Sequence, residues 1–227
     1  MALKLSVRDL SGNLMKANEI SGVLFDLDGV LIDTEGIYTG IWEEIESHYP
    51  TGIPDFALVI KGNTLPRILQ TYFEPGYHQS IISMLKKHED EMDYPVFDGV
   101  LDFLHQLGNA GIPCAIVTSS SDRKMELIRN RIPALISCFD AVITDSKVEH
   151  SKPHPDPYLK GAEALGVDPR KCIVFEDSYS GLQAGRAAGA KVVALATTNP
   201  YDTLVDKADS VIYGFDGIIL EDLIAAL

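Results

Sequence analysis

The sequence predicts an α/β fold: a doubly wound parallel sheet of the Rossmann-like type, with an all-helical domain inserted into it. Three observations favour this class. Short apolar runs recur along the 227 residues, helical patterns lie between most of them, and a long segment without any strand pattern follows the first run. Continuous apolar runs are typical of strands buried on both faces, and strands that alternate with helices form parallel sheets through right-handed crossovers.

The expected strands are the apolar runs themselves, which are short and do not alternate with polar residues. They occupy residues 23–25, 114–117, 141–143, 172–175, 192–195 and 211–212. The expected helices between them are bounded by capping and stop residues. These are a helix over 98–110 stopped by Gly111, one over 121–132, one begun by Asp156 and Pro157 and ended by Gly166, and one begun by Ser180 and ended by Gly189.

Residues 34–95 interrupt this alternation, since they show helical periodicity only. Three helices are expected there, with apolar stripes that include Ile41 and Ile45, then Leu65 and Ile68, then Ile81 and Leu85. The expected division is therefore a catalytic core of residues 1–33 and 96–227 and a helical cap of residues 34–95.

The composition excludes several classes of protein. A net charge of −14 argues against a nucleic-acid ligand and against an anionic membrane surface. Cys114 and Cys172 lie in apolar runs, where buried free thiols are common. Residues 1–20 are charged throughout and predict no signal peptide, and no apolar stretch reaches the ~18 residues that span a bilayer. We expect a cytoplasmic monomer with no nucleic-acid or membrane partner.

Polar clusters follow four of the expected strands, where open α/β sheets bind their ligands. Carboxylates suit a hard cation, whereas hydroxyls and a lysine suit phosphate. Each cluster alone has an ordinary structural explanation, as a turn, a helix cap or a solvated loop. Ordinary structure does not explain why all four clusters occur in this order, each after a buried strand. The clusters are Asp26 with Asp28, Thr118 with Ser119, Lys152, and Glu176 with Asp177.

These clusters belong to longer motifs with a family resemblance. FDLDGVLIDTE (25–35), VTSS (117–120), SKPHPDPY (151–158) and FEDSYSGLQAG (175–185) resemble the four motifs of the haloacid dehalogenase superfamily. The chain is most similar to the phosphatase and beta-phosphoglucomutase-like branch, which has a helical cap inserted after the first motif. The resemblance extends over residues 20–215, nearly the whole chain.

The resemblance implies a phosphoric monoester hydrolase that acts through an aspartyl-phosphate. Asp26 would be the nucleophile, and Asp28 would protonate the leaving oxygen and later deprotonate the attacking water. Asp28 also argues against halide displacement and phosphonate cleavage, because the members with those activities lack this second aspartate. The expected substrate is a small phosphorylated metabolite, such as a sugar phosphate.

The remaining motif residues are implied to hold the metal and the phosphate. Mg²⁺ would be bound by Asp26, the backbone carbonyl of Asp28 and Asp177, with help from Glu176. The hydroxyl of Thr118 and the N–H of Ser119 would hold phosphoryl oxygens, and Lys152 would balance the charge.

The cap leaves two alternatives open. A beta-phosphoglucomutase-like mutase would carry a histidine where Tyr38 stands and an arginine where Leu65 stands, so the sequence disfavours that activity. An inactive binding protein is a weaker alternative, since no motif residue is lost. Lys61 and Thr64, in the KGNT loop, are expected to select the substrate, although the loop could also be a simple turn between helices.

Overall fold

The computed structural model describes residues 20–227. Residues 1–19 lie outside the described residues, and with them the segment for which no signal peptide is expected and the start of the expected 1–33 core segment. Within residues 20–227 no helix has both the length and the apolar character that a membrane span requires.

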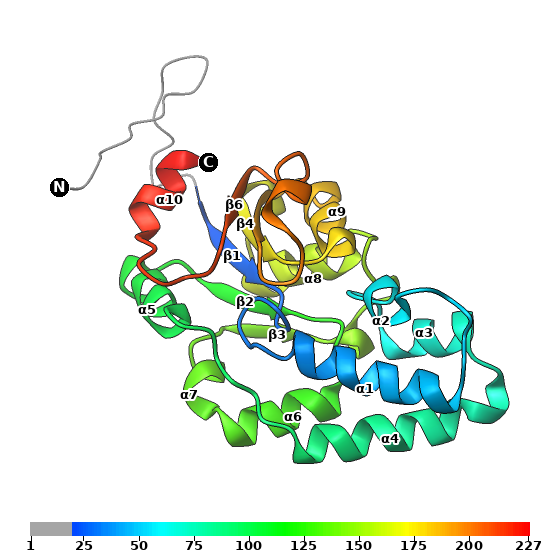
Figure 1. Ribbon diagram of the computed structural model, residues 1–227. Coiled ribbons are helices and arrows are strands. Elements are labelled where there is room, and N and C mark those ends of the chain that lie inside the picture. The colour runs from blue at the N-terminus through cyan, green and yellow to red at the C-terminus, as the bar shows by residue number, and fades with distance from the viewer. Residues whose placement is uncertain (1–19) are drawn as a thin grey trace.

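A six-stranded, entirely parallel sheet forms the centre of the molecule, with the strand order β3-β2-β1-β4-β5-β6 (Figure 1). The strands are β1 (Gly22–Phe25), β2 (Cys114–Val117), β3 (Ala141–Ile143), β4 (Cys172–Glu176), β5 (Lys191–Leu195) and β6 (Ser210–Ile212). The predicted fold class is confirmed, since each expected apolar run is a strand. The register pairs Phe25 with both Ile116 and Phe175, so β1, β2 and β4 end at the same edge.

Helices cover both faces of this sheet. They are α5 (Val100–Ala110), α6 (Asp122–Arg131), α7 (Pro133–Ile136), α8 (Asp156–Leu165), α9 (Tyr179–Ala187) and α10 (Leu220–Ala226). Short 3-10 helices also occur at Pro75–Tyr77, Asp145–Lys147, Pro169–Lys171 and Tyr201–Thr203. Expected helix starts differ from the observed ones by up to two residues, whereas α8 begins at Asp156 as expected. Helix α5 begins at Val100 rather than at residue 98. Helix α9 begins at Tyr179 rather than at Ser180, because the hydroxyl of Ser178 accepts the N–H of Gly181 and caps the helix there.

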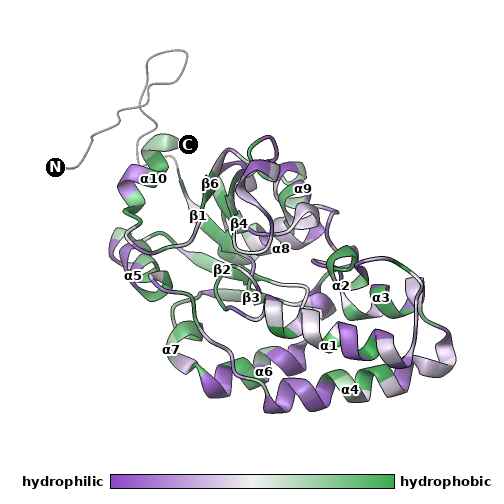
Figure 2. Cartoon of the chain, in the orientation of Figure 1, coloured by the Kyte–Doolittle hydropathy of each residue, from purple (hydrophilic) through white to green (hydrophobic). Residues whose placement is uncertain are grey.

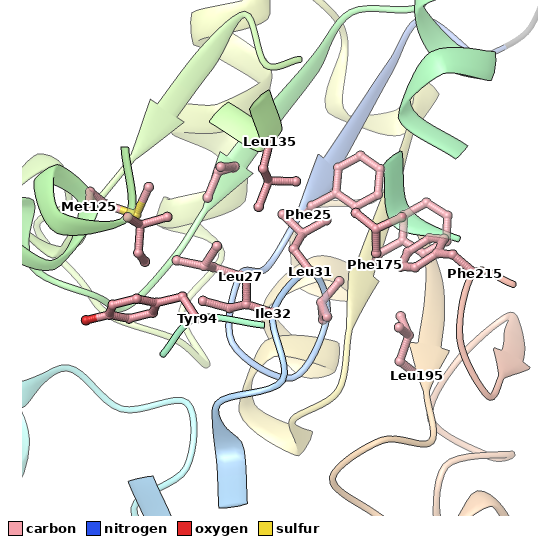
Figure 3. Close-up of a cluster of buried hydrophobic side chains, with 14 of the residues drawn as sticks. Phe25, Leu27, Leu31, Ile32, Tyr94, Met125, Leu135, Phe175, Leu195 and Phe215 are labelled. Atoms are coloured by element: carbon pink, nitrogen blue, oxygen red, sulfur yellow. The ribbon is translucent and has the colours of Figure 1, made fainter. Parts of the chain in front are cut away.

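Two hydrophobic clusters hold the sheet between its helices, because successive strand residues point to opposite faces. Val23 and Phe25 belong to the cluster with α5, α6 and α10, whereas Leu24 belongs to the cluster with α8 and α9. Figure 3 shows part of the first cluster, in which aromatic and aliphatic side chains pack together and the ring centroids of Phe25 and Phe175 are 4.9 Å apart. Burying each such side chain stabilises the fold by about 1.5–3 kcal/mol. This packing holds the carboxyl end of β1 in place.

Between β1 and α5 the structure is helical, with α1 (Glu35–His48), α2 (Phe56–Val59), α3 (Leu65–Tyr72) and α4 (His78–Glu91). These helices form a body beside the carboxyl ends of the strands, and α4 carries polar and apolar stretches side by side (Figures 1 and 2). Trp42 fixes their packing, with its ring 6.0 Å from that of Phe56 and 6.3 Å from that of Phe73. Helix α2 is not among the expected helices, because four residues give no measurable periodicity.

The two connections between this helical body and the sheet run next to each other. The N–H of Asp33 donates to the carbonyl of Pro95 over 2.8 Å, and the N–H of Phe97 donates to the carbonyl of Leu31 over 3.1 Å. Paired connections of this kind let a domain rotate about one axis. The boundaries at 33/34 and 95/96 remain a prediction.

Candidate active site

The chain turns back on itself directly after β1, which places two carboxylates at the sheet edge. The carbonyl of Leu27 accepts hydrogen bonds from the N–H groups of Val30, Leu31 and Ile32. Gly29 occupies this turn with φ +75°, and a Cβ there would lie 2.2 Å from Oδ2 of Asp177. Glycine is therefore required so that the turn after β1 can approach the acidic end of β4.

Three carboxylates gather at this point. Asp26, Glu176 and Asp177 each place one oxygen within 4.8 Å of the others. Burial raises the pKa of Asp26 to about 8 although Lys152 opposes the shift, and burial also raises the pKa of Asp177. A cluster of buried carboxylates is poorly neutralised by protein alone, and its oxygen-only donor set fits a hard divalent cation such as Mg²⁺.

Lys152 supplies the positive charge that the protein itself brings to this cluster. Its ammonium group is buried and donates to Oδ1 of Asp26 and to Oε1 of Glu176, each over 2.6 Å, and to the carbonyl of Val117 over 3.1 Å. Burial alone would lower the pKa of Lys152, but Asp26 and Glu176 outweigh it and raise that pKa. Lys152 therefore stays charged beside the nucleophile expected from the sequence.

Glu176 has its oxygens occupied by protein donors. Oε1 accepts from Lys152 and from the hydroxyl of Tyr158, the latter over 2.9 Å. Oε2 accepts from the N–H groups of Asp177 and Ser178 and from the Ser178 hydroxyl, over 2.9–3.0 Å. Glu176 thus fixes Lys152 and the loop that carries Asp177, a role the sequence did not reveal. Its direct contact with a metal ion remains a prediction.

Asp28 is not part of that group of three carboxylates, and its own carboxylate is held by three side chains. Lys124 donates to both oxygens, over 2.6 and 2.7 Å, while Thr34 donates to Oδ1 and Ser120 to Oδ2. Burial alone would raise the pKa of Asp28, but Lys124 and the hydroxyls outweigh it and lower that pKa. The structure thus describes Asp28 as a carboxylate, which accepts rather than donates a proton.

Sequence reasoning missed Lys124, whose side chain is only 4% exposed. A signal was present, because Lys124 lies four residues before Ile128 and so occupies the apolar stripe of α6. A lysine in the apolar stripe of a helix, shortly after a cluster of hydroxyl residues at the end of a strand, indicates that an acidic side chain is buried beside it. Thr34 stands at the N-cap position of α1, but its hydroxyl donates to Asp28 and does not cap the helix.

The hydroxyl cluster after β2 faces the same space. Thr118 is buried, and its hydroxyl accepts the N–H of Ser120 over 3.0 Å. The hydroxyl of Ser119 donates to the carbonyl of Gly62 over 3.0 Å, which joins the core to the loop before α3. A Cβ on Gly62 would lie 2.2 Å from Oγ of Ser180, so this loop needs a glycine to rest on the core.

A cavity lies between the sheet edge and the helical body. Asp26, Asp28 and Asp177 line it from the core, together with Thr118, Ser119 and Lys124. Trp42, Ala57, Ile60, Leu65, Ile68 and Leu85 form an apolar wall opposite them. The wall also carries an ion pair, with Lys61 and Glu35 joined over 2.6 Å.

The two cap residues expected to select the substrate are placed differently. Lys61 lines the cavity. Thr64 is buried at the start of α3 and is not among the described residues that line the cavity, whereas its neighbours Asn63 and Leu65 are. That Thr64 selects the substrate remains a prediction.

Comparison with known proteins identifies the fold and the family. The chain matches the haloacid dehalogenase-like hydrolase family over residues 23–195. It is 32% identical to a fructose-1-phosphate phosphatase of Escherichia coli (strain K12), over 76% of this chain and 95% of that protein. It is 31% identical to a bifunctional riboflavin kinase/FMN phosphatase of Arabidopsis thaliana, over 93% of this chain but only 57% of that protein.

Among solved structures, a beta-phosphoglucomutase from Clostridium difficile superimposes with a TM-score of 0.76 over 91% of this chain and 96% of that chain. At 24% identity, this likeness concerns the fold. The family match covers most of the chain and includes the expected motifs from Asp26 to Asp177. The chain therefore belongs to the haloacid dehalogenase-like hydrolase family.

Proposed function

We propose that this protein is a Mg²⁺-dependent phosphohydrolase that acts on a small phosphorylated metabolite, a sugar phosphate, through an aspartyl-phosphate intermediate. One observation carries the proposal. The carboxylate of Asp26 lines the cavity, its Oδ1 accepts a hydrogen bond from the buried ammonium of Lys152, and oxygens of Glu176 and Asp177 lie within 4.8 Å. A nucleophile, a fixed positive charge and a set of metal donors thus meet at one point.

Mg²⁺ would be held by Asp26, Asp177 and the backbone carbonyl of Asp28, and when bound it would neutralise charge on the phosphate. In the first half-reaction an oxygen of Asp26 forms a bond to phosphorus and the bond from phosphorus to the ester oxygen breaks. Asp28 gives its proton to that oxygen, which leaves as an alcohol. Thr118 and Ser119 hold the phosphoryl oxygens while Lys152 keeps Asp26 oriented.

In the second half-reaction Asp28 takes a proton from water. That water attacks phosphorus, phosphate leaves, and the Asp26 carboxylate is restored. Three side chains donate to Asp28, which favours the carboxylate form that this second step requires. To serve as the acid in the first step, Asp28 has to take up a proton from solvent and give up its ion pair with Lys124, and both side chains line the same cavity.

Two features favour a phosphatase over the alternatives. A mutase must bind a second phosphate, and Leu65 presents an apolar side chain where the resemblance would place an arginine. An inactive binding protein has no need of the buried Lys152, Asp26 and Glu176 arrangement, which costs folding free energy. The name of the fructose-1-phosphate phosphatase relative supports a sugar phosphate. We further propose a cytoplasmic monomer without nucleic-acid or membrane partners.

The test is phosphate release from a panel of phosphorylated metabolites. Turnover is expected with Mg²⁺, none is expected in EDTA, and Mg²⁺ but not Ca²⁺ is expected to restore it. Ca²⁺ is larger and takes 6–8 ligands with loose geometry, which spoils the attack angle of a carboxylate. Full turnover in EDTA, or no release from any ester including p-nitrophenyl phosphate, would contradict the proposal.

A further inference from the structure

The cations of the cavity are already paired. Lys61 and Lys124 are the lysines among the described residues that line it. Lys61 lies 2.6 Å from Glu35, and Lys124 lies 2.6 Å from Asp28. The lining thus offers a leaving group no positive charge that lacks a carboxylate partner.

The proposed first step already separates Lys124 from Asp28, whereas Lys61 stays paired, so a second phosphate that binds Lys61 has to break that lysine's pair with Glu35. The Glu35 and Lys61 side chains are only 21% and 17% exposed, so water would poorly replace the broken pair. The released carboxylate would also face the incoming phosphate at close range, and like charges in a half-buried site repel strongly. An uncharged leaving group meets neither difficulty and can cover the apolar wall of Trp42 and Leu85 with its C–H groups.

We propose that Glu35 is a specificity-determining residue that neutralises Lys61 and thereby restricts the enzyme to phosphate monoesters of uncharged alcohols. This inference rests on the proposed function and names the substrate class of the same site. Specificity of this kind comes from a repulsive element directed against the wrong substrate. Glu35 is well placed for it, because it begins α1 on the cap wall while the phosphate is expected at Asp26 on the core.

The experiment compares kcat/KM for a hexose monophosphate, the corresponding hexose bisphosphate and inorganic pyrophosphate. The wild type is expected to prefer the monophosphate at least tenfold. Glu35→Gln frees Lys61 and is expected to raise the bisphosphate-to-monophosphate ratio about tenfold, since one unit charge is removed beside the second phosphate. In Glu35→Gln combined with Lys61→Met, the ratio is expected to return toward the wild-type value.

Glu44→Gln is the matched control, because it removes the same charge from the same helix at a residue that contacts His88 and is not among the described residues that line the cavity. Its ratio should equal that of the wild type. Lys61→Met alone leaves Glu35 unpaired and should lower the ratio below wild type, which gives a second test if Glu35→Gln fails to fold. The inference would be overturned if Glu35→Gln and Lys61→Met each left the bisphosphate-to-monophosphate ratio of kcat/KM unchanged. It would also be overturned if the wild type hydrolysed pyrophosphate as fast as the monophosphate. Failure of the proposed function would differ, since no ester would then be hydrolysed.

Discussion

The two walls of the cavity are built from different kinds of structure. On the core wall, the reacting groups follow the ends of parallel strands, so the register of β1, β2 and β4 sets their separations. On the cap wall, Glu35 and Lys61 come from the first turn of α1 and the loop before α3. Backbone hydrogen bonds of the sheet hold the first wall, whereas side-chain packing between helices holds the second.

The charges that support the core wall from behind are buried more deeply than the ion pair on the cap wall. Lys152 and Glu176 are 1% and 0% exposed, whereas Lys61 and Glu35 are 17% and 21% exposed. A buried pair that loses one partner leaves an uncompensated charge, while a partly hydrated pair can be rescued by water. The core wall should therefore tolerate little change, and the cap wall can change its substrate without loss of the reaction.

The largest effect is expected at Asp26. Asp26→Asn removes the oxygen that bonds to phosphorus and keeps the side-chain shape, so turnover should fall by more than ~1,000-fold with every ester. Steady-state phosphate release with activated and unactivated esters measures it. A variant that retains one tenth of the wild-type rate would show that the core wall does not hold the nucleophile.

The next effect compares one lysine from each wall. Lys152→Met strands two buried carboxylates and should lower the free energy of unfolding by about 3–5 kcal/mol. Lys61→Met should lower it by about 0–1 kcal/mol, because its pair is partly hydrated. Urea unfolding at pH 7 measures both, with the exposed Lys160→Met as the control. Equal losses at Lys152 and Lys61 would remove the distinction between the walls.

A smaller loss of activity is expected at Asp28, whose role in the core wall differs from that of Asp26. Asp28→Asn should slow hydrolysis of an alkyl phosphate far more than the capture of phosphate from p-nitrophenyl phosphate, whose leaving group needs no proton. The burst of p-nitrophenol and the steady-state rate, measured separately, report the two half-reactions. The assigned roles are refuted if both esters lose the same factor.

The same contrast explains what the sequence could predict. Strands buried on both faces leave continuous apolar runs, and the residue after each run lies at the sheet edge, so Asp26, Thr118 and Asp177 could be placed together from spacing alone. Lys152 could be grouped with them for the same reason. Its bonds to Asp26 and Glu176 depend on the loop before α8, for which periodicity gives no rule.

The helices of the cap could be predicted from the sequence, but the side chains that the cap presents to the cavity could not. Which side chain of a short loop faces a cavity depends on how neighbouring helices pack, so the sequence alone could not show that Lys61 lines the cavity and that Thr64 is not among the described residues that do. Glu35 was missed because an acid in the first turn of a helix is ordinary near the positive end of its dipole. Its role emerges only from the distance to Lys61, which is separated from it by α1 and α2.

The most direct test of the central claim, that Asp26 carries the phosphoryl group, is to trap the intermediate. Enzyme and substrate are mixed with Mg²⁺ for less than one turnover and quenched in acid, and the acyl phosphate is reduced with borohydride before peptide mapping. Reduction is expected at Asp26, and none is expected in EDTA or in Asp26→Asn. A reduced site elsewhere in the chain, or turnover without any reduced aspartate, would contradict the claim.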